Sequence, residues 1–195
     1  MARPARFDQN TILDAALQVV ALHGPQAATT EAVAGHMGGH AGSIYYRFPT
    51  KDHLLAALWM RCAHAGQAGL FKALARDDVD EALDGAVLHY PRWSRKNPAP
   101  ARILAAYGRE QVTPRWPDEL AAALENVNND LAAAIAEFTT RWYTTITPNR
   151  RRAVTFAVLD LPASAIRRYL LADRTPPTTL DAPILAAARA ALAAA

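Results

Sequence analysis

The chain has 195 residues, of which 51% are apolar and 20% charged, and its formal net charge is +3. This length is enough to bury the cores of one or two small domains, and the charge permits an anionic partner without requiring one. No apolar run approaches the roughly 18 residues that span a bilayer, and the start of the chain lacks the apolar stretch of a secretory signal, so we expect a cytoplasmic protein with no membrane partner.

Apolar residues recur at intervals of three and four along almost the whole chain, and alternating β-branched runs are missing. This pattern predicts an all-α fold. Three short helices come first: one from about 9 to 22 that ends at Gly24-Pro25, one that follows Thr29-Thr30 and ends at Gly38-Gly39, and one of about two turns that ends at Pro49. One of the two threonines should be the N-cap of the second helix.

Longer helices are expected in the rest of the chain. Thr50 should cap a helix from Lys51 to about Ala75. Further helices are predicted near 79–95, 99–111, 117–143, 148–171 and 181–194. Pro162 lies inside the fourth of these ranges, where its missing N–H should kink or divide the helix.

The third helix carries two tyrosines in the segment HAGSIYYRFPTK, where a core would favour leucine. At about 100° per residue, Ile44 and Phe48 lie on one side and Tyr46 lies on the opposite side. The residues on or beside this outer side are Gly42, Ser43, Tyr45 and Arg47. A tyrosine placed against DNA can donate its hydroxyl to a phosphate and lay its ring on a sugar or a thymine methyl group.

Lys51 falls in the first turn of the fourth helix, where a cation opposes the helix dipole at a cost of a few tenths of a kcal/mol. A bound phosphate would reverse that cost, because the ammonium group and the free N–H groups of the helix start both attract an anion. Thr30 offers a similar hydroxyl and N–H pair at the start of the second helix. The alternative for Lys51 is an ordinary surface lysine paired with a neighbouring carboxylate.

These three helices resemble the DNA-binding domain of the tetracycline-repressor (TetR) family of bacterial transcriptional regulators. That family typically shows a glycine after its first helix, a Thr-Thr pair at its second, and then Gly, small, Leu/Ile, Tyr, Tyr, any, Phe, Pro, Ser/Thr, Lys, Glu/Asp before Leu-Leu. The corresponding residues here are Gly24, Thr29-Thr30, Gly42 to Asp52 and Leu54-Leu55. The resemblance covers roughly residues 8 to 60, and beyond them the chain resembles the family only in being helical and of similar length.

The resemblance implies about nine helices, with an N-terminal helix-turn-helix domain over residues 1–50 and a ligand-binding and dimerisation domain over residues 51–195. The DNA-contacting residues that it implies are Thr30, His40, Ser43, Tyr45, Tyr46, Arg47 and Lys51. The chain departs from the family pattern at Gly39-His40-Ala41, where a hydrophobic residue, a Ser or Thr and a Lys or Arg are common. We therefore expect affinity to depend more on Arg47, Lys51 and the N-terminal Arg3 and Arg6. Charge placement matters here, because residues 1 to 60 hold four basic and four acidic side chains.

A regulator of this family is expected to be a homodimer whose two reading helices meet successive major grooves of a palindromic double-stranded DNA operator. Its usual behaviour is repression that a small apolar or aromatic ligand relieves. Family dimers usually form through the last two long helices, here 148–171 and 181–194, where Ala188, Ala191 and Leu192 would permit close approach. Alternatively, these alanines only favour helix.

Aromatic residues in the remainder of the chain are consistent with an apolar ligand pocket. The candidate lining residues are Trp59, Trp93, Tyr107, Glu110 and Trp142, with Arg109 as a further polar group. For any one of the aromatic residues, packing in a helical core is the alternative.

Catalytic and metal motifs are missing, so we expect no enzyme activity, no cofactor and no metal site. His36 and His40 have the spacing of a helical metal pair, but Gly38-Gly39 breaks the helix between them. Cys62 should be a buried small apolar residue. Two alternatives stay open: a helical small-molecule-binding protein or enzyme whose N-terminal bundle does not bind DNA, and a protein-interaction module.

His40 leads to a prediction about pH. If its side chain contacts DNA, protonation adds a positive charge at the contact, and imidazole protonates within the range from pH 8 to pH 6. Operator affinity should rise as the pH falls through this range, by roughly two- to tenfold, and His40→Gln should remove that rise. Fluorescence anisotropy with a labelled operator measures it, and wild-type affinity of the variant at both pH values would contradict the contact.

Overall fold

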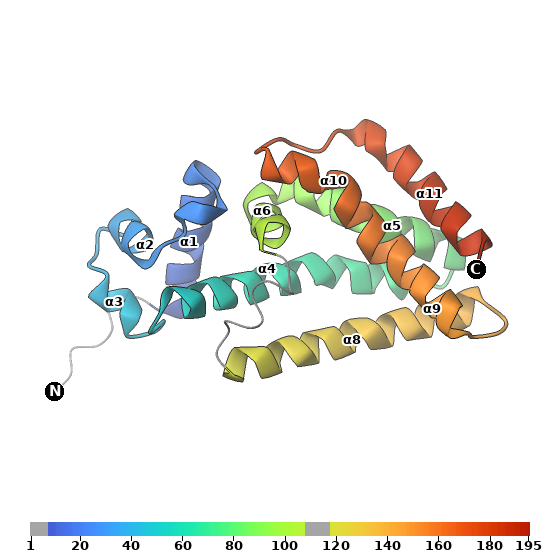
Figure 1. Cartoon of the computed structure of the whole chain (residues 1–195), viewed down its shortest axis with the longest axis horizontal. Coiled ribbons are helices and arrows are strands. Elements are labelled where there is room, and N and C mark those ends of the chain that lie inside the picture. Colours follow the sequence, from blue (N-terminus) through green and yellow to red (C-terminus); the bar gives the residue numbers. More distant parts are fainter. Residues whose placement is uncertain (1–7, 108–117) are drawn as a thin grey trace. The chain divides into compact units, whose positions relative to one another are not determined.

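The computed structural model of the chain describes residues 8–107 and 118–195, of which residues 118–124 are described by their backbone alone. Every regular element in these two ranges is a helix, as the sequence predicts (Figure 1). The chain divides into two compact units, one of Met1–Ala63 and Pro98–Leu124 and one of His64–Asn97 and Glu125–Ala195. The predicted division into a DNA-binding domain of residues 1–50 and a ligand-binding and dimerisation domain of residues 51–195 concerns function. The division by packing does not test it, so it stays a prediction.

The first unit begins with α1 (Gln9–His23), the short 3-10 helix η1 (Pro25–Ala27) and α2 (Thr30–His36). Asp8 caps α1 by accepting a hydrogen bond of 2.7 Å from the Thr11 N–H. Gly24 ends α1 with a φ of 83°, a backbone conformation that L side chains rarely adopt. Thr29, and not Thr30, is the N-cap of α2, and its hydroxyl accepts from the Ala32 N–H at 3.1 Å.

The third helix is shorter than the predicted two turns. α3 spans only Gly42–Tyr45, and the N–H groups of Arg47 and Phe48 then both donate to the Ile44 carbonyl at 2.8 Å. The chain cannot continue as helix because Pro49 disfavours helical backbone at the residue before it. α4 (Lys51–Leu74) starts directly afterwards, next to α3 (Figure 1).

The core of the first unit is built from apolar side chains of α1, α2, α3 and the first part of α4, together with α6 (Pro98–Ala106). Its largest fully buried side chains include Ile12, Leu54, Leu58 and Ile103. Burying a side chain of this kind contributes about 1.5–3 kcal/mol. Ile103 belongs to α6, so a helix from the middle of the chain completes the core of the N-terminal helices.

Polar contacts fix α4 and α6 within this unit. Arg61 forms an ion pair with Asp14 and donates to the Asn10 carbonyl of α1 at 3.2 Å. Trp59 donates its indole N–H to the Tyr107 carbonyl at 2.9 Å, and the Tyr107 hydroxyl donates to the Pro25 carbonyl at 3.2 Å. Tyr107, the residue directly after α6, is therefore tied to both α4 and η1.

The second unit contains α5 (Val79–Lys96), the main part of α8 (Asp118–Trp142), α9 (Pro148–Thr155), α10 (Leu161–Leu171), η4 (Thr178–Leu180) and α11 (Asp181–Ala193). α10 and α11 pack against α5 (Figure 1). Arg95 of α5 donates to both carboxylate oxygens of Asp181, at 2.9 and 2.7 Å. Arg189 of α11 pairs with Asp80 and Asp84 near the other end of α5.

Pro162 divides the predicted helix 148–171, as its missing N–H requires. α9 ends at Thr155, a π-helical turn η3 covers Phe156–Asp160, and α10 begins at Leu161. The wider π turn accommodates the hydrogen bond that proline cannot make.

Two of the three predicted close-approach residues of the last helix require a correction, whereas Ala191 is partly exposed. Ala188 and Leu192 are buried inside the second unit, because they lie on the side of α11 that packs within it. They are therefore not available to a second copy of the chain. The exposed small residues of α11 lie on its other side and include Ala182, Ala186, Ala187 and Ala190.

Helices α4 and α5 approach each other closely at a glycine of the second unit. His89 donates its Nε2–H to the Gly66 carbonyl at 2.6 Å, and burial lowers the pKa of His89, which favours the neutral ring. A Cβ on Gly69 would lie 2.2 Å from His89 Cε1. Position 69 thus has no room for a side chain while the imidazole stays in place.

This contact predicts opposite effects for two glycine substitutions. Gly35 of α2 has nothing within 4 Å of an added Cβ, so Gly35→Ala should raise the free energy of unfolding by about 0.5–1 kcal/mol through helix propensity. Gly69→Ala should instead lower it by about 1–3 kcal/mol, because the methyl group displaces His89. Urea unfolding followed by circular dichroism measures both values, and a Gly69→Ala variant as stable as Gly35→Ala would contradict the contact.

Candidate nucleic-acid interface

The predicted inner and outer sides of α3 are confirmed by burial. Ile44 is 0% and Phe48 4% exposed in the core of the first unit, whereas Tyr46 is 79% exposed. A ring of this size at such exposure gains little from the protein itself. It is available to a partner that offers both apolar and hydrogen-bonding groups.

Tyr45 lies beside Tyr46 and is engaged with α2. Its hydroxyl donates to Glu31 Oε1 at 2.9 Å, although 42% of the residue stays exposed. The pKa of Glu31 is lowered, first by its own backbone N–H and then by the Tyr45 hydroxyl, so the carboxylate is charged at neutral pH. Glu31 was not among the residues that the sequence predicted for this surface.

The turn before α3 is closed by a side chain of the predicted set. Ser43 donates its hydroxyl to the His40 carbonyl at 2.7 Å, which fixes the approach to the one-turn helix. His40 itself is exposed. Ser43 thus supports the turn, and His40 presents its ring on the surface.

Two exposed cations follow on either side of Pro49. Arg47 and Lys51 form no ion pair with any residue in the described parts of the chain, so the paired alternative for Lys51 is not found there. Thr50 accepts a hydrogen bond of 3.3 Å from the His53 N–H, which supports its predicted role as the cap of α4. Lys51 therefore stands in the first turn of a long capped helix, where an anion is favoured.

Thr30 does not share this exposure. It is only 2% exposed, because its side chain points into the core of the first unit beneath the start of α2. Its hydroxyl is therefore not on the surface that carries Tyr46 and Lys51. The N-terminal Arg3 and Arg6, which the sequence also suggested, lie outside the described residues.

The aromatic residues predicted to line a ligand pocket are engaged in packing. Trp59 and Tyr107 meet each other in the first unit through the hydrogen bond described above. In the second unit Trp93 stacks on Tyr90 and Trp142 on Phe138, with ring centroids 5.8 and 6.0 Å apart. Glu110 and Arg109 lie outside the described residues, so their predicted roles stay predictions.

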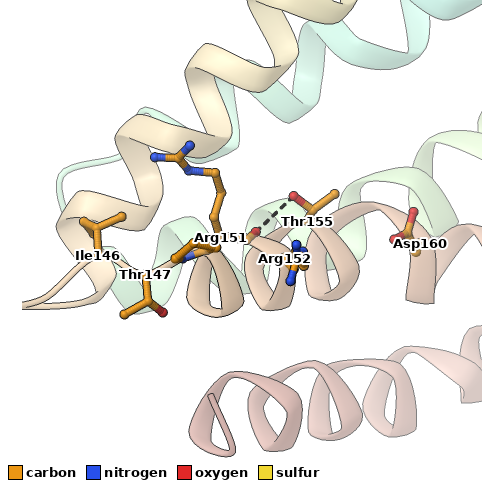
Figure 2. A pocket seen from close by; sticks show the side chains of 7 residues that line it. Ile146, Thr147, Arg151, Arg152, Thr155 and Asp160 are labelled. Carbon is orange, nitrogen blue, oxygen red and sulfur yellow. Dashed lines mark hydrogen bonds between the residues drawn. The ribbon is translucent and has the colours of Figure 1, made fainter.

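A different cleft, of about 460 Å³, opens in the second unit (Figure 2). It is lined by Ile146, Thr147, Pro148, Arg151, Arg152, Thr155 and Asp160. Figure 2 shows the two arginine side chains leaving α9 in different directions, and Thr155 donates to the Arg151 carbonyl at 3.1 Å. Burial raises the pKa of Asp160. The lining combines charged side chains with apolar surface and contains no aromatic residue, so it differs from the aromatic pocket that the sequence suggested.

Chemically reactive groups are scarce in the described residues. Cys62 is buried as predicted, and burial raises the pKa of its thiol to about 12, so the reactive thiolate is not formed at neutral pH. The described residues contain no cluster of three or more side chains suited to hold a metal ion. Within the same residues, none of the helices combines the length and apolarity that crossing a bilayer needs.

Comparison with known proteins places the N-terminal helices in a family. Residues 12–58 match the bacterial regulatory proteins of the tetR family. These residues contain the whole exposed surface around α3, including Glu31, Tyr45, Tyr46 and Lys51. No match was found among curated proteins.

Solved structures share the fold over nearly the whole chain. A tetR-family regulatory protein from Rhodococcus RHA1 has a TM-score of 0.72 and 21% identity, over 98% of this chain and 98% of that one. The regulator FadR from Bacillus subtilis, in complex with stearoyl-CoA, has a TM-score of 0.67 and 15% identity, over 95% and 96%. A TetR variant from Acinetobacter baumannii AYE, in complex with minocycline, has a TM-score of 0.65 and 20% identity, over 97% and 96%.

Proposed function

We propose that this chain, which belongs to the tetR family of bacterial regulatory proteins and is a DNA-binding transcriptional regulator, represses transcription from a palindromic operator until a small ligand releases it. The observation that carries the proposal is the exposed side of α3. Tyr46 projects from a helix whose opposite side is anchored in the core, and two cations flank it. Operator binding also implies a cytoplasmic location.

The proposed DNA contacts divide into two kinds. Arg47, Lys51 and the free N–H groups at the start of α4 hold phosphates, and the exposed His40 adds a further polar contact. Tyr46 lies against sugar or base edges as α3 enters the major groove. Each neutralised phosphate should contribute about −0.9 to the slope of log affinity against log salt concentration, so affinity falls as salt rises.

A homodimer is proposed because a one-turn reading helix covers too few base pairs to give specificity alone. The second unit carries exposed apolar groups suited to an interface, namely Phe156 at 45% and Leu171 at 50% exposure, together with the outer alanines of α11. Monomers of soluble proteins rarely leave large apolar patches uncovered. A two-fold interface of this kind would present two copies of α3 to one duplex.

The ligand is proposed to be a small molecule with apolar or aromatic character. FadR binds stearoyl-CoA and the TetR variant binds minocycline in their solved structures, so the shared fold accepts chemically different compounds. The second unit is the proposed binding unit. A ligand can release the operator only to the extent that it binds the non-DNA-binding conformation more tightly than the DNA-binding one.

The DNA-binding role is tested by the double variant Tyr46→Ala, Lys51→Ala. Because it removes one groove contact and one phosphate contact, operator affinity should fall by roughly 100-fold. Fluorescence anisotropy with a duplex selected from random sequence by the wild-type protein measures the change. Lys72→Ala is the matched control, since Lys72 is an exposed cation in the last turn of the same helix.

In that experiment the control should bind within about twofold of wild type, and both variants should keep the wild-type thermal unfolding midpoint. Unchanged DNA binding by the double variant would overturn the proposed surface. Loss of folding would instead assign Tyr46 and Lys51 a structural role.

The dimer is tested by placing charge on the proposed interface. Phe156→Asp with Leu171→Asp should raise the dimer dissociation constant by roughly 100-fold or more, because the carboxylates would be buried without partners. Leu22→Asp is the control, since Leu22 is 66% exposed on α1 in the other unit. Sedimentation velocity measures the oligomeric state, and a dimer that survives the double substitution would contradict this interface.

A further inference from the structure

Glu31 places a negative charge within the surface that is proposed to meet DNA. It is exposed in the first turn of α2, and its carboxylate accepts a hydrogen bond from Tyr45 of α3. Two separate helices therefore meet at this one carboxylate. A negative charge here opposes the phosphate backbone, so its presence requires an explanation.

The simplest explanation is that an acidic residue in the first turn complements the helix dipole. A carboxylate that is freely solvated would serve that purpose equally well. The dipole does not account for the 2.9 Å hydrogen bond from Tyr45, which ties Glu31 to the reading helix. The dipole also does not explain why a carboxylate, which can only accept hydrogen bonds, lies on a surface that is proposed to meet DNA, whose phosphates are also acceptors.

We propose that Glu31 is a specificity-determining residue that accepts a hydrogen bond from the exocyclic amino group of a cytosine in the major groove, with Tyr45 as its positioning residue. The assignment rests on the proposed function. An ionised carboxylate has acceptors only, so among DNA groups it can bond base donors and is repelled by phosphates. In the major groove the N4 amino group of cytosine is the donor that a carboxylate pairs with best.

Hydrogen-bonding capacity remains for that contact. A carboxylate offers about four acceptor positions. In this structure Glu31 Oε1 accepts a hydrogen bond of 2.9 Å from the Tyr45 hydroxyl. This bond directs the carboxylate toward α3 and leaves acceptor positions on the exposed side chain.

The role of Tyr45 follows from the same geometry. Its hydroxyl hydrogen is given to Glu31, so in this arrangement it is not available to a phosphate. By fixing the carboxylate before DNA arrives, Tyr45 lowers the conformational entropy lost on binding. This assignment separates the two tyrosines: Tyr46 contacts DNA, and Tyr45 orients the residue that reads a base.

The test compares base preference across variants rather than affinity alone. Duplexes bound by the full-length protein are selected from a random pool and sequenced, for wild type, Glu31→Ala, Glu31→Gln and Tyr45→Phe. Wild type should favour cytosine at one position of each half-site by about tenfold or more over the other bases. Glu31→Ala should lose the preference at that position only, and Glu31→Gln should shift it toward adenine, which pairs with glutamine.

Tyr45→Phe should weaken the same preference without affecting other positions, an effect that a merely structural role would not produce. In the Glu31→Ala background it should change base preference no further, because the group that Tyr45 positions is gone. Asp52→Asn is the matched control, since it removes an exposed carboxylate next to Lys51. It should raise general affinity and leave every base preference unchanged.

Three outcomes would overturn the assignment. If Glu31→Ala and Glu31→Gln keep the wild-type preference at every position, Glu31 is only a helix-start acid. If Tyr45→Phe alters base preference in the Glu31→Ala background, Tyr45 reads DNA itself. If the wild-type protein enriches no sequence at all, the proposed function fails, and the assignment fails with it.

Discussion

The orientation of a single helical turn is the constraint on which the rest of the interface depends. α3 has four residues, too few to be stable alone, since an isolated helix of that length does not form in water. Its orientation is imposed from below, because Ile44 and Phe48 are buried in the core of the first unit. Pro49 then ends the turn, so the chain passes directly into α4 with Lys51 in its first turn. Anchoring one side of the turn is what exposes Tyr46 on the other.

Support for that anchor comes from distant parts of the chain. Ile103 of α6 fills part of the same core, and the Tyr107 carbonyl accepts a hydrogen bond from Trp59 of α4 across 48 residues of sequence. Arg61 joins α4 to α1 through Asp14 and the Asn10 carbonyl. Trp59 and Tyr107, two of the residues predicted to line a ligand pocket, pack against this core, and the pocket itself stays a prediction. Substitutions in the buried side chains of α6 or α4 would therefore change the position of α3, because the three helices share one core.

Much of this arrangement could be predicted from the sequence because it is encoded locally. Apolar spacing, caps and breakers set most helix bounds within a few residues, and the angular spacing of Ile44, Tyr46 and Phe48 gave the correct inner and outer sides. The bond between Glu31 and Tyr45 could not be predicted, because it depends on how the turn after α2 folds back over 14 residues. Burial of Thr30 and the return of α6 likewise depend on packing that periodicity does not specify. The family match agrees with these predictions, since it covers residues 12–58, where the apolar spacing, caps and helix breakers are clearest.

The balance of charge in the N-terminal segment also fits a reader of sequence better than a general binder of polyanions. Four basic residues among the first 60 are matched by four acidic ones, so bulk attraction to phosphate is weak. Weak non-specific affinity is an advantage, because a genome offers a very large number of competing sites. A carboxylate such as Glu31 weakens the binding of every duplex, because it repels the phosphates. A hydrogen bond from a base offsets this loss only in duplexes that place a donor opposite the carboxylate. Specificity then arises from the difference between these two cases, and it needs a side chain held in place before binding, which is what the Tyr45 hydroxyl provides.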